Sequence, residues 1–202
     1  MRMALTAACV GLALMGMAGQ TSAAVVTSFF DDFEAEPYGI PHSDFAQWVV
    51  NDGSVDTVGP VPAGFDVDCQ GSNVCVDLDG TNTSGAPTLV TKDSFAVGTY
   101  KLSFDLGSQF TNPGDTVTIS LGDYSETFSV PGVLWQTFMR TVSVSTTSPS
   151  AELRFVHSAT DNNGIKLDNV SVSAVPLPAA LPLFLTMLAG MGFLRWWKRR
   201  VA

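Results

Sequence analysis

Basic residues are scarce in this 202-residue chain, and their scarcity limits its partners. Lysine and arginine number 10 against 19 aspartates and glutamates, and the formal net charge is −9. All 19 acidic residues lie between Asp31 and Asp168, together with only five basic residues. The formal net charge of this stretch is therefore −14. A surface of this sign repels phosphate backbones. We therefore expect that nucleic acid is not a partner.

The sequence also lacks the motifs on which common enzyme classes depend. It has no Gly-x-Ser-x-Gly turn, no phosphate-cradling loop and no metalloprotease helix, and it contains only 2 histidines. Paired carboxylates for glycoside hydrolysis remain an alternative, because 19 acids supply many pairs. We expect a protein that is not an enzyme.

Long hydrophobic runs are missing from the middle of the chain and occur only at its two ends. At the N-terminus, Arg2 precedes an apolar stretch over residues 3–18, and Ser22-Ala23-Ala24 supplies the small residues of a cleavage site. This order is typical of a secretory signal peptide. We expect residues 1–24 to be removed after Ala24 and the chain to be exported.

The C-terminal residues 175–202 contain three parts in order. Val175, Pro176, Leu177, Pro178 and Ala179 come first, an uncharged stretch reaches residue 194, and the basic cluster Arg195, Lys198, Arg199 and Arg200 follows. A helix over residues 177–194 would span about 27 Å, enough for a thin bilayer. The basic end stays in the cytoplasm, so a transmembrane helix here places the domain in the periplasm. On physical grounds alone this is an ordinary single-span anchor.

The proline motif, the apolar stretch and the basic end together resemble the VPLPA-CTERM variant of the PEP-CTERM sorting signals of Gram-negative bacteria. The resemblance implies that an exosortase processes an inner-membrane-anchored precursor and delivers it to the cell surface or the extracellular space. It also implies an association with exopolysaccharide.

Residues 25–174 lack a helical period and contain short alternating runs separated by Gly, Pro, Asn and Asp. Tyr100, Leu102, Phe104 and Leu106, for example, would all face one side of a strand. Such runs predict half-buried antiparallel strands. About ten strands in one domain favour an all-β jelly-roll sandwich. The expected strands lie near 27–33, 46–50, 54–58, 74–78, 88–91, 100–106, 117–121, 125–130, 136–144, 153–156 and 165–172.

The last of these strands changes parity. Ile165 and Leu167 are apolar at odd positions, whereas Val170 and Val172 are apolar at even ones. A β-bulge at Asp168-Asn169 would explain the change and turn Asp168 away from bulk water. A register slip at a sheet edge is the alternative.

Cys69 and Cys75 are the only cysteines that remain after signal cleavage, and five residues lie between them. An exported chain meets an oxidising compartment. We therefore expect a disulfide between these two residues that closes a small loop.

Segments spread over the domain, namely 30–34, Trp48, 53–56, 76–81, 98–106 and 167–172, together resemble the galactose-binding-like jelly rolls of carbohydrate-binding modules. The resemblance implies a structural calcium ion held by Glu34 and Asp168, with Asp32 as a further ligand. Carboxylate oxygens suit this hard cation. Solvated or capping carboxylates in an acidic protein are the alternative.

These observations favour a non-catalytic, exported surface or matrix protein that associates with glycans. Aromatic faces hold sugars by stacking, and Tyr38, Tyr124 and Trp135 are the candidate platforms, with packing in the core or in turns as the alternative for each. We assign Trp48 to the core. A structural or adhesion protein with a protein partner is the alternative. A carboxylate-dependent glycan-active enzyme is the least favoured one.

Overall fold

The computed structural model describes residues 24–60, 67–71, 73–81, 85–108, 114–130, 134–148, 150–158, 164–176 and 187. Within these residues the chain forms 14 strands, which confirms the all-β prediction. Residues 1–23 of the expected signal peptide and Leu177, Pro178 and Ala179 of the sorting motif lie outside the described residues, as does the C-terminal basic cluster. In the described part of the chain, no helix is long and apolar enough to cross a membrane.

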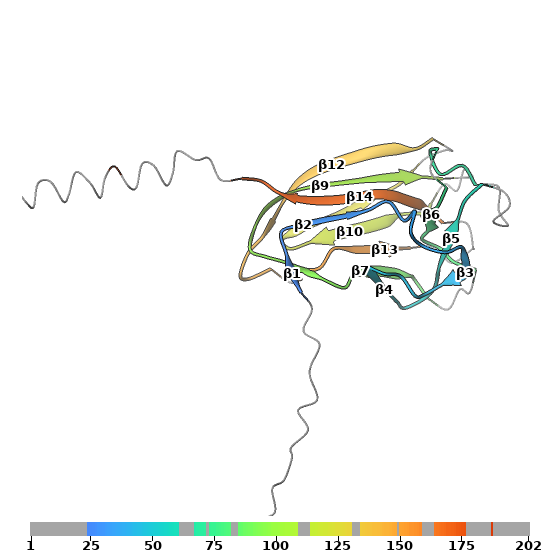
Figure 1. Ribbon diagram of the computed structural model, residues 1–202, viewed down its shortest axis with the longest axis horizontal. Coiled ribbons are helices and arrows are strands. Elements are labelled where there is room, and N and C mark those ends of the chain that lie inside the picture. Colours follow the sequence, from blue (N-terminus) through green and yellow to red (C-terminus); the bar gives the residue numbers. More distant parts are fainter. Residues whose placement is uncertain are drawn as a thin grey trace, which may run out of the picture.

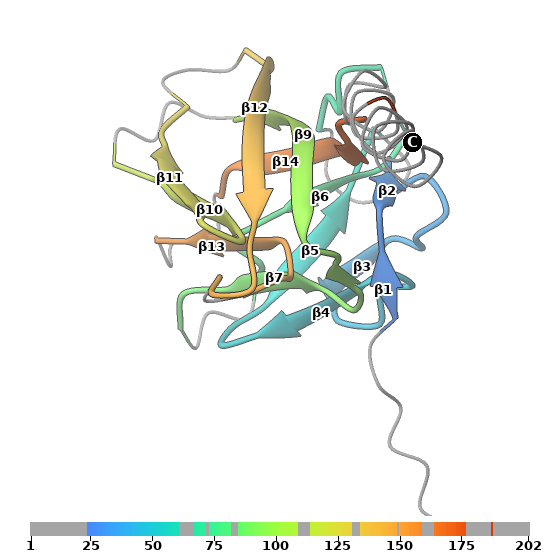
Figure 2. The same cartoon turned by 90° about the vertical axis from the view of Figure 1, so that its left-hand side faces the viewer.

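Two sheets pack face to face as a β-sandwich (Figures 1 and 2). The larger sheet has the order β12 (Gln136–Val144), β9 (Gly98–Gly107), β14 (Lys166–Ala174), β6 (Cys75–Asp77), β5 (Val55–Val58), β3 (Gly39–His42), and β2 (Ser28–Asp31) also pairs with β14. The smaller sheet has the order β11 (Tyr124–Phe128), β10 (Val117–Leu121), β13 (Arg154–His157), β7 (Thr88–Thr91), β4 (Trp48–Asn51). A short parallel pair joins β1 (Val25–Val26) to β8 (Ser94–Phe95).

The core between the sheets follows from alternation along the strands. In β9, Tyr100, Leu102, Phe104 and Leu106 are at most 1% exposed, whereas Lys101 between them is exposed. The predicted alternation of this strand is therefore confirmed. Every second side chain of a strand points to the same face, so one apolar face per sheet is enough to build the core.

Phe104 lies at the centre of an aromatic cluster that joins the two sheets. Its ring stacks on Phe138 of β12 with centroids 5.6 Å apart, and it meets Phe128 and Phe155 edge-on at 5.3 and 5.8 Å. Phe138 belongs to the larger sheet, whereas Phe128 and Phe155 belong to the smaller one. Such pairs contribute about 0.5–1.5 kcal/mol each beyond their buried area.

Trp48 is 1% exposed, which confirms its assignment to the core. Its indole Nε1 donates a hydrogen bond of 2.7 Å to Oδ2 of Asp31, and the backbone N–H of Phe33 donates to Oδ1 at 2.8 Å. Burial raises the pKa of the Asp31 carboxyl, and the two donors oppose that shift. The sandwich thus accepts a carboxylate beside its core because that carboxylate is hydrogen-bonded.

The parity change of the last strand is a β-bulge, as expected. The register of β14 against β9 shifts between Asp168 and Ser171, and Asn169 has a φ of 50°. Asp168 is 0% exposed, and its Oδ1 accepts a hydrogen bond of 2.7 Å from the N–H of Asn169. The extra residue turns Ile165 and Leu167 as well as Val170 and Val172 toward the core.

Three strands were not expected from the sequence: β1, β3 and β8. Each has at most four residues. β3 contains Pro41, which cannot donate to a strand ladder, and it lies at the edge of the larger sheet. Short edge strands carry too little alternation to be recognised.

The two ends of the domain lie together. The N–H of Ala174 donates to the carbonyl of Thr27 at 3.1 Å, and that of Val175 donates to the carbonyl of Thr99 at 2.8 Å. Figure 1 shows β1 and the end of β14 at the same end of the sandwich. The segments before and after the domain therefore join it at one end.

Phe104→Ala should lower the free energy of unfolding by about 3–5 kcal/mol, because it leaves a cavity among three aromatic rings. Chemical denaturation measures this change. Met139→Ala on the neighbouring strand is the control: Met139 is 73% exposed, so its removal should change the value by no more than about 0.5 kcal/mol. Equal losses for both variants would contradict the placement of Phe104.

Candidate functional site

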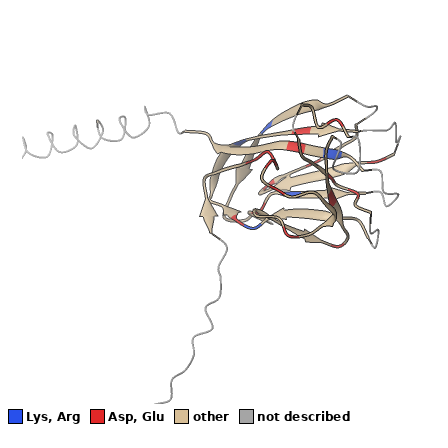
Figure 3. Cartoon of the chain, turned by 45° about the vertical axis from the view of Figure 1, so that its right-hand side comes forward, with Lys and Arg blue, Asp and Glu red and all other residues tan. Residues whose placement is uncertain are grey.

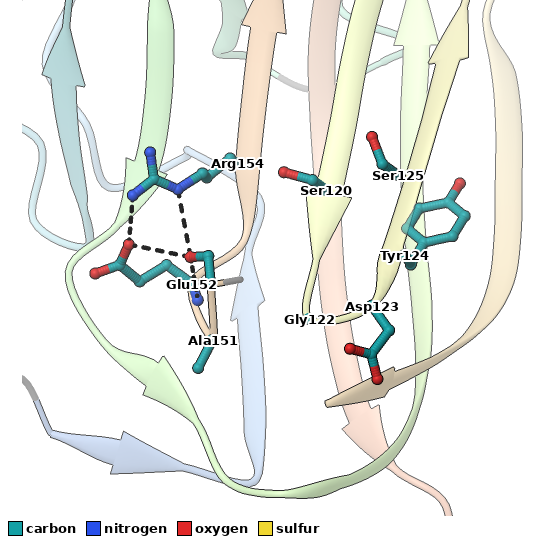
Figure 4. Close-up of a pocket in the computed structure, with 9 residues that line it drawn as sticks. Ser120, Gly122, Asp123, Tyr124, Ser125, Ala151, Glu152 and Arg154 are labelled. Carbon is teal, nitrogen blue, oxygen red and sulfur yellow. Dashed lines mark hydrogen bonds and ion pairs between the residues drawn. The ribbon is translucent and has the colours of Figure 1, made fainter. Parts of the chain in front are cut away.

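An open hollow of about 730 Å³ lies on the outer face of the smaller sheet, beside the turn between β10 and β11. Three side chains form a row across its floor, because Ser125 of β11 pairs with Ser120 of β10, and Ser120 pairs with Arg154 of β13. Figure 4 shows Arg154 and Glu152 on one side, and Ser120, Ser125 and Tyr124 on the other. We call this hollow the Ser/Arg groove; it is lined by Ser120, Gly122, Asp123, Tyr124, Ser125, Ser150, Ala151, Glu152 and Arg154.

A half-exposed ion pair forms one wall of the Ser/Arg groove. Nη2 of Arg154 donates to Oε2 of Glu152 at 2.7 Å, and Nε of Arg154 donates to Oγ of Ser150 at 3.4 Å. The two charged side chains are 39% and 32% exposed. An ion pair this open to water contributes little to stability. Its remaining N–H groups and carboxylate lone pairs are accessible to a polar ligand.

Tyr124 borders the Ser/Arg groove, but its ring points away from the floor (Figure 4), because Tyr124 pairs with the buried Leu121 and packs against the core. A charged pair holds its hydroxyl. Its hydroxyl donates to Oε2 of Glu126 at 2.8 Å, and Glu126 also accepts from Nε and Nη2 of Arg140 at 2.7 and 2.6 Å. Burial raises the pKa of Tyr124, and the Glu126 carboxylate adds to the rise. The hydrogen bonds from Arg140 lower the pKa of Glu126 to about 2. The Tyr124 ring is thus fixed, and its hydroxyl stays protonated.

A second, smaller hollow of about 310 Å³ lies on the outer face of the larger sheet. Lys101 sits in it among the hydroxyl groups of Ser103, Ser171 and Ser173. Basic residues are few among the strands (Figure 3). Within the described residues, Lys101 forms no ion pair, whereas Arg140, Arg154 and Lys166 each pair with a carboxylate.

The two other aromatic candidates are placed differently from Tyr124. Tyr38 is 43% exposed, and its hydroxyl donates to the carbonyl of Asn73 at 2.8 Å. Trp135 packs over Gly107, where a Cβ would come within 2.5 Å of the ring, and its Nε1 donates to the carbonyl of Asp68 at 2.8 Å. The three aromatic candidates therefore do not form one platform. Of the three, only Tyr124 borders the Ser/Arg groove. Their roles in glycan binding stay predictions.

The predicted disulfide is confirmed. Cys69 and Cys75 are bonded, with Cα atoms 5.6 Å apart. Both are at most 1% exposed and pack with Val58 and Val67 against Trp135, apart from the main core. The bond fastens the segment 67–71 over the outer face of β5 and β6.

The carboxylates expected to bind calcium do not come together as a ligand set. In the ranges that the structure describes, no three His, Cys, Asp or Glu side chains gather in a way that could hold a metal ion. Glu34 instead accepts hydrogen bonds from the N–H and side-chain amide of Asn73 and from the N–H of Val74. Asp32 accepts from the N–H of Glu34 at 3.3 Å. Calcium binding stays a prediction that the geometry of Asp32, Glu34 and Asp168 does not support.

Ser120, Glu152 and Arg154 were not recognised as site residues from the sequence. The alternation of Val117, Ile119 and Leu121 does place Ser120 on the outer face. It does not show that β10 lies beside β13, because the two strands are more than 30 positions apart. The groove depends on that non-local pairing.

The sequence matches no protein-family model and no curated protein. Among solved structures, it is similar to the K2 cleaved adhesin domain of Lys-gingipain, with a TM-score of 0.52 and 17% identity over 72% of this chain and 99% of that one. For the K1 domain of Lys-gingipain from Porphyromonas gingivalis W83, the TM-score is 0.49 and the identity is 20%, over 75% of this chain and 100% of that one. For the CBM22-2 xylan-binding domain from Paenibacillus barcinonensis, the TM-score is 0.43 and the identity is 13%, over 73% of this chain and 99% of that one.

These similarities concern the fold. The K2 domain, with a TM-score above 0.5, shares the overall arrangement of this sandwich. The other two similarities are too weak to define a shared fold. Identity of 20% or less says nothing about which residues bind a ligand.

Glu126→Gln should destabilise the protein slightly at neutral pH, because the ion pair of Glu126 with Arg140 is partly exposed, and it should cease to do so in acid. The pKa of Glu126 falls from its ordinary 4.5 to about 2 on folding, so its ion pair stabilises the fold above pH 4.5 and is lost as the pH falls toward 2. Urea denaturation at a series of pH values measures the difference between the two proteins. A difference that stayed constant down to pH 2 would contradict the role of the Arg140 pair.

Proposed function

We propose that this protein is an exported, non-catalytic module of the cell surface or extracellular matrix that binds polysaccharide in the Ser/Arg groove. The observation that carries the proposal is the groove itself, a wide hollow on a sheet face where Ser120, Ser125, Glu152 and Arg154 converge. Sugar rings carry many hydroxyl groups, each able to donate and accept. A groove of hydroxyls, one carboxylate and one guanidinium offers partners of both kinds.

The polar floor of the Ser/Arg groove supports the choice of a sugar ligand. The hydroxyl groups of Ser120 and Ser125 lie in one row with the guanidinium of Arg154, so the floor can donate to and accept from several sugar hydroxyls at once. The hollow is open along the sheet and can take part of a longer chain. These features suit a polysaccharide better than a small, fully enclosed ligand.

The route to the surface is part of the same proposal. The signal-like N-terminus and the VPLPA-like C-terminus favour export and processing by an exosortase, and the galactose-binding-like resemblance favours a glycan partner. The shared end of the sandwich from which β1 and β14 emerge fits this view, because a single tether there leaves the sheet faces uncovered. The acidic domain adds solubility outside the cell.

A structural or adhesion role with a protein partner is the second candidate, and one observation favours it. Phe30 and Met139 are 59% and 73% exposed on the outer face of the larger sheet. Phe30 pairs with Ser171, Ser171 with Ser103, and Ser103 with Met139, so these residues lie in one row across four strands. An exposed row of this kind can serve as a protein contact.

Arg154→Ala should weaken polysaccharide binding at least about tenfold, because a hydrogen bond to a charged group contributes about 1.5–3 kcal/mol. Retention of the full-length protein on immobilised xylan and alginate measures the effect. These two probes distinguish a neutral from an acidic polysaccharide.

Lys101→Ala is the matched control, because Lys101 is exposed on the opposite sheet and should leave binding unchanged. Loss of binding with Lys101→Ala alone would move the site to the larger sheet. Retention of neither polysaccharide by the unmodified protein would favour the protein-partner role.

A further inference from the structure

A buried lysine on the last strand faces a buried carboxyl on its neighbour. Lys166 of β14 pairs directly with Asp77 of β6, and the two residues are 3% and 6% exposed. Nζ of Lys166 contacts Oδ2 of Asp77. Ion pairs withdrawn from water in this way lose hydration that their mutual attraction only partly replaces. The Ser/Arg groove makes no use of either residue.

The two oxygens of Asp77 have different surroundings. Oδ1 accepts hydrogen bonds from the backbone N–H groups of Gly164 and Asp79, at 3.1 and 3.0 Å. Oδ2 faces the lysine. Nζ of Lys166 also donates to the carbonyl of Gly164 at 3.2 Å. Two fixed N–H donors on one oxygen are what stabilises negative charge as it develops on a carbonyl under nucleophilic attack.

A third acidic residue stands beside the pair. Asp56 of β5 is directly opposite Asp77 in the strand register and is 4% exposed. Directly opposed residues have Cβ atoms about 5 Å apart, so the two carboxyl groups are neighbours. Asp56 is held by the hydroxyl of Thr81 at 2.6 Å. Burial raises the pKa of both Asp56 and Asp77, so that neutral, protonated forms are favoured relative to exposed carboxyls.

From this arrangement we infer that Lys166 and Asp77 form an intramolecular isopeptide bond, with Asp56 as the group that moves the proton. Nothing in the proposed polysaccharide function requires it. Neighbouring strands of one sheet place the nucleophile, the electrophilic carbon and Asp56, and the residues just outside β6 and β14 supply the donors to the oxygen. Holding the reacting groups in contact replaces the activation that a carboxyl would otherwise need.

The reaction balances without another reactant. A proton passes from Nζ to the Asp77 carboxyl, which leaves a neutral amine and a neutral acid. The Nζ lone pair then attacks Cγ, the C–N bond forms, and the C=O π electrons move to Oδ1, which Gly164 and Asp79 hold. Protonated Asp56 gives its proton to Oδ2 and takes one from Nζ in exchange. The Oδ1 lone pair then re-forms the C=O bond, and the Cγ–Oδ2 bond breaks as water leaves. No oxidation or reduction takes place.

The product keeps the hydrogen bonds of the starting pair. Oδ1 becomes the amide oxygen and still accepts from Gly164 and Asp79, and the remaining N–H on Nζ can still donate to the carbonyl of Gly164. Two buried charges disappear, which removes their desolvation cost. The bond would tie β14, the strand that leads to the C-terminal segment, to the neighbouring strand β6.

Tryptic digestion of the reduced full-length protein followed by mass spectrometry tests the inference. We expect one cross-linked species joining the peptide that contains Asp77 to the peptide that contains Lys166. It should be lighter than the sum of the two by one water molecule, with no cleavage after Lys166. Two separate peptides of unchanged mass, with cleavage after Lys166, would show an ordinary ion pair and overturn the inference.

Three variants sharpen the result. Lys166→Arg should abolish the cross-linked species because a guanidinium does not form this amide, whereas the matched Lys101→Arg should retain it. Asp56→Asn should reduce the cross-linked fraction at least tenfold in freshly made protein. A full cross-linked fraction with Asp56→Asn would overturn the role of Asp56, and a cross-link that persists in Lys166→Arg would overturn the assignment to Lys166.

Discussion

The larger sheet depends on the pairing of one strand, β14, with three others. Along one edge β14 pairs with β9, and along its other edge it pairs first with β6 and then with β2. Without β14 the sheet would separate into β12–β9 on one side and β6–β5–β3 on the other. The bulge after Asp168 makes this triple pairing compatible with the core. By adding one residue, it lets both halves of the strand present their apolar side chains to the same face.

This arrangement explains why the larger sheet contains so many buried polar groups. The start of β14 brings Lys166 and Asp168 to the outer face, where both are at most 3% exposed. Trp135 packs there over Gly107, the partner of Lys166 on β9. Each buried charge then needs a partner inside the protein. Lys166 contacts Asp77, and the Asn169 side chain donates to Asp105 at 3.0 Å. The buried polar side chains in this part of the sheet therefore bind to one another rather than to solvent.

Local patterns in the sequence were enough to predict every strand except β1, β3 and β8, and several single features. The alternation of β9, the bulge at Asp168, the buried Trp48 and the Cys69–Cys75 disulfide each depend on neighbouring residues or on one pair, and each is confirmed. The order of the strands depends on contacts between distant segments, which local alternation does not encode. For that reason the sequence did not predict the Ser/Arg groove or the Lys166–Asp77 pair.

The partners of Glu34 illustrate the same limit for ligand sites. As a carboxylate shortly after the first long strand, it resembles a calcium ligand, but its oxygens accept N–H groups of Asn73 and Val74, about 40 positions away. A carboxylate with that many donors has few lone pairs left for a cation. The charged pair of Arg154 and Glu152, in contrast, lies half-exposed on an uncovered part of the smaller sheet. Its polar atoms are accessible to water, which is the physical reason why the proposed polysaccharide site lies there rather than among the buried acids.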